Sequence, residues 1–381
     1  MTSLKTTNRA SGFSLLELMV SMALGLLILG SASQLFTIGM KTSSLVSNRV
    51  EMQQNVRTAL NLMAQDISLA GAGLPPGGLQ LPVGGPSLSR FGCDQGPICY
   101  LNNNNYPVGT VGTVAPTTPI SNYMFGLIPG KDNGMAKGGP ASIPATGRVP
   151  DAVTSIYVDN SLALNLYSGA FPAPGTNAGK TVTLTAPTPM PATLLPATDP
   201  GVGIKVGDLL LITTSLGSAV GEVSTVSPLN TTGATVTFAD GDPLAMNQST
   251  ATGSNIKAIV TGAGTPVTVQ RLLAITYYIQ VPGGGQLPRL MRQVNGQTPQ
   301  PVADNIIDLQ IDYDMCDTGF TGGTCANTPD PLAVNISPNN IHKISITLMS
   351  QSLTSNGKDS QSMQLATAVS ARNLTFRDRY Q

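Results

Sequence analysis

A long uncharged segment near the amino terminus constrains this chain more than any other feature of its sequence. The 23 residues from Leu18 to Met40 contain no Asp, Glu, Lys or Arg. As an α-helix rising about 1.5 Å per residue, they extend about 35 Å and cross the roughly 30 Å hydrocarbon core of a bilayer. Lys5 and Arg9 precede the segment, and positive residues mark the cytoplasmic side. The rest of the chain is therefore expected outside the cytoplasm.

A secretory signal peptide and a simple membrane anchor are the alternative interpretations of this segment. A signal peptide has an apolar core of about 7–15 residues followed by a small-residue cleavage site, whereas the helical pattern here continues to Ala70. A simple anchor leaves Glu17 unexplained, because a buried carboxylate at the start of a membrane helix costs several kcal/mol unless it finds a partner.

The residues around Glu17 resemble a known processing signal. Gly12-Phe13-Ser14-Leu15-Leu16-Glu17, followed by an uncharged helix, is similar to the class III signal of type IV prepilins. The resemblance implies that a prepilin peptidase cuts between Gly12 and Phe13 and methylates the new amine of Phe13. Glu17 would then set the subunit register, because its carboxylate pairs strongly with the amine of a neighbouring subunit in low dielectric. A carboxylate that snorkels to the lipid headgroups is the alternative.

Beyond the membrane segment the sequence predicts an α+β fold. From Lys41 to Ala70 an apolar stripe recurs at spacings of three and four and is expected to pack on a globular head; it consists of Met52, Val56, Ala59, Leu60, Met63 and Ile67. With 41 Gly, 29 Pro and 4% aromatic residues, the remaining chain favours β-structure with many turns. The prediction is a long N-terminal pilin helix packed on a β-rich, mostly antiparallel head.

The predicted organisation has five parts. They are a cleaved leader at 1–12, a transmembrane helix half at 13–40, an amphipathic helix half at 41–70, a Gly/Pro-rich loop and β insertion at 71–200, and a β-rich pilin-like head at 201–381. Strands are expected at 151–158, 181–186, 206–214, 220–226, 234–238, 272–280, 304–315, 341–350 and 361–370, with a hairpin turn at Asn356-Gly357.

The order of the later motifs resembles one group of pilins. VGDLLLI, LAITYYI, LPRLMRQ, PVADNIIDLQIDYD, IHKISITLMSQS and AVSARN follow one another as in PilW-type minor pilins, whose heads are related to J-type minor pseudopilins. The resemblance implies a non-enzymatic subunit that helps initiate type IV pilus assembly at the tip and supports twitching motility and attachment. A minor pseudopilin of type II secretion and a pilus-tip adhesin, in which residues 71–200 bind a surface, remain alternatives.

The same resemblance implies where the chain works and with what. The expected partners are other minor pilins, the major pilin, prepilin peptidase, the inner-membrane assembly platform and a tip adhesin. The chain would cross the bacterial inner membrane once, with its head in the periplasm, and after assembly would lie in the cell-surface pilus.

Four cysteines form two local pairs in the sequence, Cys93 with Cys99 and Cys316 with Cys325. Neither pair has the two-residue spacing of a zinc knuckle or a thioredoxin-type site. Two local disulfides are favoured, which would agree with an oxidising compartment; free buried thiols and a metal site are the alternatives.

Nothing in the sequence predicts catalysis, a cofactor or nucleic-acid binding. His342 is the only histidine, and no nucleophile elbow or nucleotide-binding glycine loop is present. Lys and Arg balance Asp and Glu at 20 each, so no global field gathers nucleic acid. Asp308, Asp312 and Asp314 share a predicted strand face. A solvated face is the favoured interpretation, and a calcium site is the alternative.

Overall fold

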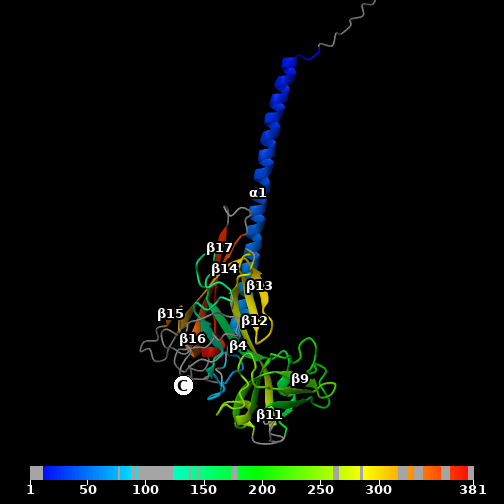
Figure 1. Ribbon diagram of the computed structural model, residues 1–381, viewed down its shortest axis with the longest axis vertical. Helices are drawn as coiled ribbons and strands as arrows, with labels where there is room; N and C mark the ends of the chain where they lie inside the picture. Colours follow the sequence, from blue (N-terminus) through cyan, green and yellow to red (C-terminus); the bar gives the residue numbers. More distant parts are fainter. Residues whose placement is uncertain are drawn as a thin grey trace, which may run out of the picture. The chain divides into compact units, whose positions relative to one another are not determined.

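The computed structural model describes residues 12–75, 78–86, 89, 91, 123–136, 139–144, 146–172, 179–260, 266–283, 286–315, 325–329, 338–352 and 361–375. The chain forms two compact units, Met1–Glu51 and Met52–Gln381. Helix α1 (Leu15–Ser68) contributes to both and is drawn in blue in Figure 1. The predicted α+β class is confirmed: one long helix and a β-rich head whose named strand pairs are all antiparallel.

The described part of the head contains a large sheet, a four-stranded sheet and a two-stranded sheet formed by β1 and β2. The elements after α1 are β1 (Leu79–Gln80), β2 (Tyr123–Met124), β3 (Leu127–Gly130), β4 (Ala152–Asp159), η1 (Leu164–Leu166), β5 (Ser168–Ala170), β6 (Thr181–Thr185), β7 (Leu209–Thr214), β8 (Gly217–Glu222), β9 (Thr225–Pro228), β10 (Ala234–Thr237), η2 (Ile256–Ile259), β11 (Pro266–Gln280), β12 (Arg289–Val294), β13 (Gln300–Asp304), β14 (Ile306–Met315), β15 (Ala326–Thr328), η3 (Pro338–Asn340), β16 (Ile341–Gln351), β17 (Ser362–Ser370) and α2 (Arg372–Thr375).

Strand β11 is the longest strand of the large sheet and joins its parts. It pairs with β5 and β7 over its first half and with β4 and β12 over its second half. The strands of the 71–200 range and those of the 201–381 range thus share one sheet, because β4 pairs with β11 over seven residue pairs. The four-stranded sheet has the order β15-β14-β16-β17.

The second half of α1 forms part of the head core. All six residues of the predicted apolar stripe are buried, while Arg57, Asn61 and Gln65 are exposed. The stripe residues from Val56 to Ile67 pack with apolar residues of β11, β12, β14 and β16 in one hydrophobic cluster. This confirms that helical periodicity between residues 52 and 67 marks a core face.

Two glycines allow α1 to end against the large sheet. Gly71 has a φ of +82°, a conformation that L side chains rarely adopt, and its N–H donates to the carbonyl of Ile156 at 2.8 Å. A Cβ atom on Gly126 would collide with the Cα atom of Gly71. The glycine that follows Ala70 therefore allows the backbones at Gly71 and Gly126 to approach each other closely.

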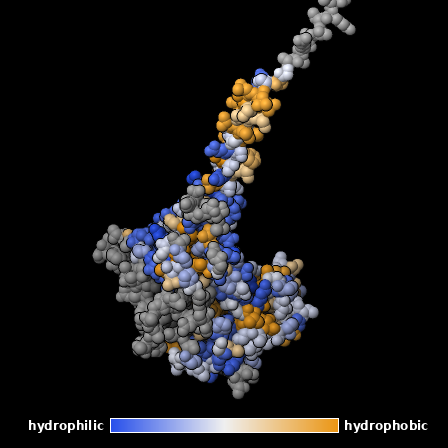
Figure 2. Space-filling model, turned by 45° about the horizontal axis from the view of Figure 1, so that its top comes forward, coloured by the Kyte–Doolittle hydropathy of each residue, from blue (hydrophilic) through white to orange (hydrophobic). Residues whose placement is uncertain are grey.

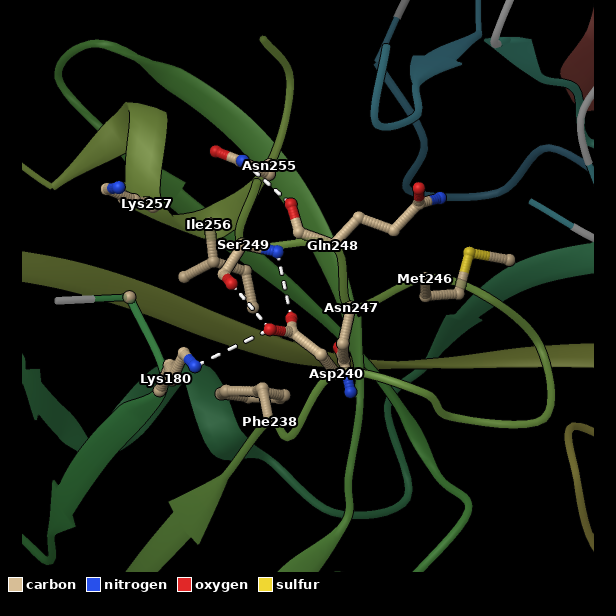
Figure 3. A pocket seen from close by; sticks show the side chains of 11 residues that line it. Lys180, Phe238, Asp240, Met246, Asn247, Gln248, Ser249, Asn255, Ile256 and Lys257 are labelled. Atoms are coloured by element: carbon tan, nitrogen blue, oxygen red, sulfur yellow. Dashed lines mark hydrogen bonds and ion pairs between the residues drawn. The ribbon is translucent and has the colours of Figure 1, made fainter. Parts of the chain in front are cut away.

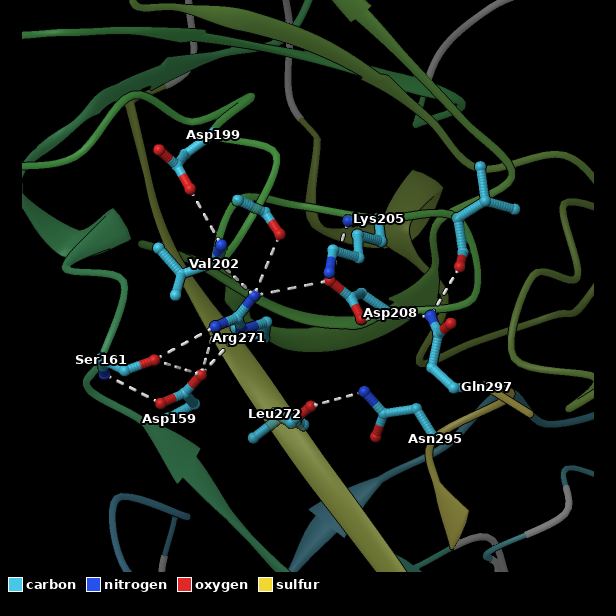
Figure 4. A network of polar contacts seen from close by, with 12 residues as sticks. Asp159, Ser161, Asp199, Val202, Lys205, Asp208, Arg271, Leu272, Asn295 and Gln297 are labelled. Atoms are coloured by element: carbon cyan, nitrogen blue, oxygen red, sulfur yellow. Dashed lines mark hydrogen bonds and ion pairs between the residues drawn. The ribbon is translucent and has the colours of Figure 1, made fainter. Parts of the chain in front are cut away.

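A separate hydrophobic cluster forms around β6, β7, β8 and β10, and a buried arginine connects this region to the rest of the large sheet. Arg271 on β11 donates through Nε to Asp159 Oδ2 at 2.8 Å and through NH1 to the carbonyl of Val202 at 2.8 Å. Figure 4 shows this guanidinium between the end of β4 and the 199–208 segment. Burial raises the pKa of Asp159, but hydrogen bonds from Ser161 and the charge of Arg271 outweigh it and the pKa is lowered. The carboxylate therefore stays ionised beside its arginine.

Candidate functional site: the N-terminal processing and assembly segment

The predicted cleavage bond lies in exposed, non-helical backbone. Residues 12–14 precede α1 and have no regular secondary structure. The side chain of Phe13 is 85% exposed, and a Cβ atom on Gly12 would meet nothing within 4 Å. A peptidase can therefore reach the Gly12–Phe13 bond in an extended conformation without unwinding the helix.

Ser14 and Glu17 form a capping box at the start of α1. The N–H of Glu17 donates to Ser14 Oγ at 3.2 Å, and the N–H of Ser14 donates to Glu17 Oε2 at 3.4 Å. Reciprocal bonds of this kind satisfy two backbone donors that a helix start leaves open. The S-x-x-E pattern was present in the sequence but was not predicted to cap the helix.

This cap reduces the free-energy cost of placing the Glu17 carboxylate at the start of a membrane helix. In the single chain its carboxylate already has a partner within its own helix start, at a long 3.4 Å. An ionised carboxylate has about four acceptor positions, so most of the acceptor positions of Glu17 remain available for hydrogen bonds. The side chain is exposed, and it can accept a second, stronger donor without losing the cap.

The first half of α1 is an exposed apolar surface. Helix α1 is long and apolar enough to cross a membrane by length and composition, and Figure 2 shows hydrophobic side chains along this part of the helix. Large apolar residues such as Leu26, Leu27 and Ile28 are about two-thirds exposed, at 68–69%. This is the surface expected of a segment whose surroundings are lipid or neighbouring helices.

Three hydroxyl groups of this half are bonded back to the helix. Ser21, Ser31 and Thr37 each donate to the carbonyl three or four residues earlier, at 2.8–2.9 Å. Such back-bonding satisfies a hydroxyl where water is absent. These three hydroxyl groups therefore enter an apolar environment with their donors satisfied.

The end of α1 is fastened to the head by a buried carboxylate. Asp66 is 4% exposed. Its oxygens accept from Arg292 Nε at 2.8 Å, Arg292 NH2 at 3.2 Å, Tyr277 OH at 2.5 Å and Tyr157 OH at 3.2 Å. Burial and the negative charge of Asp66 raise the pKa of both tyrosines, so both hydroxyls remain donors. This cluster was not predicted, because its local signal in the sequence is no more than a charged residue next to the apolar stripe position Ile67.

The aspartates of β14 have different partners. Asp308 is 2% exposed and accepts from Arg148 NH1 at 2.9 Å. Asp314 faces Lys343 at 3.3 Å and accepts from Asn327 at 2.7 Å. Asp308 thus does not lie on a solvated face as expected, because Arg148 reaches over it from the segment before β4. In the described part of the chain no group of three or more His, Cys, Asp or Glu side chains is arranged to hold a metal.

Of the four cysteines, only Cys325 lies among the described residues; Cys93, Cys99 and Cys316 lie outside them. Cys325 is disulfide-bonded and is not a free thiol. The pairing of Cys316 with Cys325 and of Cys93 with Cys99 stays a prediction. The predicted turn at Asn356-Gly357 also lies outside the described residues, although β16 and β17 on either side of it are paired antiparallel.

One small hollow in the head contains charged side chains. Figure 3 shows Lys180, Asp240 and Ser249 along its wall. Lys180 Nζ lies 3.5 Å from Asp240, and Ser249 donates both its N–H and its hydroxyl to the same carboxylate. Burial tends to raise the pKa of Asp240, but these hydrogen bonds and Lys180 outweigh it and the pKa is lowered. A carboxylate held ionised in this way closes the 240–249 loop and is a poor proton acceptor.

The pKa of a second carboxyl group in this region, that of Glu222, is raised and not lowered. Glu222 on β8 is 3% exposed and accepts from the N–H of Leu244 at 3.0 Å. Burial is the main reason that its pKa is raised to about 8, and the adjacent Asp242 carboxyl group raises it further. The folded chain therefore retains this proton at pH values where the unfolded chain has released it.

This proton makes the head less stable as the pH rises. Between the ordinary pKa of 4.5 and the folded value of about 8, the folded state binds more protons than the unfolded state, so the free energy of unfolding falls with increasing pH. We expect a decrease on the order of a few kcal/mol between pH 5 and pH 8. Glu222→Gln keeps the shape without a titrating proton. Urea unfolding at both pH values should show a smaller decrease in this variant; an equal decrease would contradict the assignment.

The comparisons with known proteins agree with the N-terminal geometry. Residues 7–33 match the family model described as the prokaryotic N-terminal methylation motif. No curated protein and no solved structure matches the chain at the required significance. The matched motif and the long apolar helix define the chain as a type IV pilin-like or pseudopilin-like prepilin with a class III signal. This class implies processing by a prepilin peptidase and assembly with pilins, and its members are generally structural subunits rather than enzymes.

Proposed function

We propose that this chain is a minor pilin of the PilW type, a non-enzymatic subunit that helps initiate a type IV pilus at its tip. The observation that carries the proposal is the helix start, where an accessible Gly12–Phe13 bond is followed by Glu17 at the head of an exposed apolar helix. Cleavage would place a methylated amine on Phe13. The order of the head motifs supports the minor pilin over other prepilins, and twitching motility and attachment would depend on it.

The proposed register comes from the chemistry of Glu17. A carboxylate in low dielectric gains more from an ionised amine than from a neutral N–H, because two full opposite charges then attract each other at short range. The long contact with Ser14 leaves room for that second partner. A neighbouring subunit whose Phe13 amine reaches Glu17 would therefore be held at one axial position.

Two variants separate the charge of Glu17 from its role in the cap. Glu17→Gln keeps an oxygen that can accept from the N–H of Ser14, since Gln also completes a capping box, but it removes the charge. Ser14→Ala keeps the charge and removes one hydroxyl of the cap, which costs about 1 kcal/mol.

We expect Glu17→Gln and Glu17→Ala to reduce both surface pili and co-purification with other minor pilins by about tenfold or more, the effect of about 1.4 kcal/mol or more of lost pairing. Ser14→Ala should have a much smaller effect. Piliation is scored by shearing and immunoblotting of cells that express each variant. Normal piliation by Glu17→Gln would contradict the register role. A loss of protein secretion with normal pili would indicate a pseudopilin of type II secretion instead.

A further inference from the structure

Within the described part of the chain, β17 has an open outer edge. β17 ends the order β15-β14-β16-β17 and pairs with β16 over nine residue pairs, from Lys343–Ser370 to Gln351–Ser362. Among the residues that the structure describes, β16 is the only strand that pairs with it. Its side chains alternate between exposed and half-buried until Val369, which is buried.

The direction of the backbone groups follows from the bonds at the two ends of this ladder. Ser352 donates its N–H to the carbonyl of Gln361, and Ala371 donates to the carbonyl of His342. Antiparallel pairs alternate between bonded and non-bonded positions. The odd-numbered residues of β17 therefore bond to β16, and the N–H and C=O groups of Gln364, Ala366 and Ala368 point to the open side.

The other sheet ends in the described part of the chain carry features that discourage pairing. β13 contains Pro301 and ends at Asp304, β9 has four residues and ends at Pro228, and β15 has three residues. Prolines, charges and short length are the usual means by which proteins protect sheet edges.

Two strands that branch from the large sheet are protected in similar ways. β3 has four residues and contains Pro129. The edge of β8 is covered by the loop after β10, because the N–H of Glu222 donates to Asn247 Oδ1 at 3.0 Å. Strand β17 differs from all of these: it has nine residues, SMQLATAVS, with no proline and no charge.

We propose that the open edge of β17 binds an extended segment of another protein, which adds a strand to the β15-β14-β16-β17 sheet. Main-chain hydrogen bonds would supply the affinity, as in other complexes formed by strand addition. The proposal goes beyond the role in pilus assembly, because it concerns the head and not the N-terminal segment.

The side chains of β17 define the chemistry of this partner strand. Met363, Leu365 and Thr367 are half-buried and continue the apolar face of the sheet, whereas Gln364, Ala366 and Ala368 face solvent. A strand placed beside them needs apolar, preferably β-branched side chains at every second position and small or polar ones between. Because the edge is uncharged, the segment should carry little charge over about eight residues.

Strand β16 itself has this pattern and provides a probe. Its residues 344–351, ISITLMSQ, are uncharged, and from Ile344 to Leu348 apolar and polar side chains alternate. We expect a fluorescently labelled peptide of this sequence to bind the full-length protein in detergent saturably, as measured by fluorescence anisotropy.

Proline on the open side tests the mode of binding. Ala366→Pro removes an N–H that points away from β16, and Ala368→Pro does the same two residues later. We expect each to weaken peptide binding by about tenfold or more. Ala366→Ser keeps the N–H and should bind as the unmodified chain does. Unchanged thermal unfolding of at least one proline variant shows that its head is intact.

Three outcomes would overturn the proposal. They are no binding by the unmodified chain, equally tight binding by both proline variants, or a dimer of the chain that Ala366→Pro dissociates while the peptide does not bind. The last would assign the edge to a second copy of this chain. Because binding is measured on purified protein, failure here is distinct from normal piliation by Glu17→Gln, which would contradict the proposed register role.

Discussion

Asp66→Ala is expected to lower the free energy of unfolding of the head by about 3–5 kcal/mol, the usual effect of removing one partner of a buried ion pair. The substitution leaves Arg292, whose side chain is 25% exposed, without its carboxylate. It also leaves the hydroxyls of Tyr157 and Tyr277 in the core without the acceptor that they share. Unsatisfied buried polar groups add to the loss. Urea unfolding of the full-length chain in detergent, followed by circular dichroism, measures the effect.

Strand β12, which carries Arg292, also carries Arg289, and the ion pair of Arg289 provides a matched control. Arg289 and Asp304 also form an Arg–Asp bridge involving β12, at 2.8 Å, but their side chains are 40% and 62% exposed. Exposed pairs contribute about 0–1 kcal/mol, so Asp304→Ala should leave the unfolding midpoint almost unchanged. Equal effects of the two substitutions would show that burial of Asp66 does not determine its contribution.

Gly12→Val is expected to abolish the removal of residues 1–12 almost completely. A branched side chain at position 12 places a Cβ atom and two methyl groups beside the bond that a peptidase must approach closely, whereas glycine leaves that approach open. Without the cut, no amine forms at Phe13 and Glu17 lacks its proposed partner. The variant should therefore remain in the membrane fraction and be missing from sheared pili. Intact-mass spectrometry of the purified chain shows whether Phe13 is the first residue and whether it is methylated.

Gly25→Ala is the control for this experiment. A Cβ atom on Gly25 would also meet nothing within 4 Å outside its own stretch of helix, but Gly25 is inside α1 and far from the cleavage bond. Alanine favours a helix over glycine by about 1 kcal/mol, so the chain should be cut normally. If Gly12→Val were cut as efficiently as Gly25→Ala, the predicted cleavage position would be wrong.

The long helix and most major strands could be predicted from the sequence because their signals are local. The stripe from Met52 to Ile67 has helical spacing, and the observed α1 ends at Ser68, within two residues of the predicted end. The later strands show alternation or apolar runs, and β4, β6, β10, β14, β16 and β17 lie within two residues of their predicted ranges. Turns and edge strands of two to four residues, such as β1 and β15, are too short to carry such a pattern.

Contacts between distant residues were not predictable in the same way. Asp66 lies 91, 211 and 226 residues before Tyr157, Tyr277 and Arg292, and nothing in its neighbourhood indicates which residues it meets. Asp308 fits the polar side of an alternating strand, yet the guanidinium of Arg148, 160 residues earlier in the chain, covers it. The capping box was different: Ser14 and Glu17 are three residues apart, and the pattern could have been recognised from the sequence alone.

The hydrogen bonds between Asp66 and the head have a mechanical consequence for a subunit that is anchored through its helix. Its carboxylate is hydrogen-bonded to side chains from β4, β11 and β12, three adjacent strands that are bonded to one another along their backbones. Tension on α1 is therefore divided among three strands, and the helix can detach at this point only if four side chains separate together.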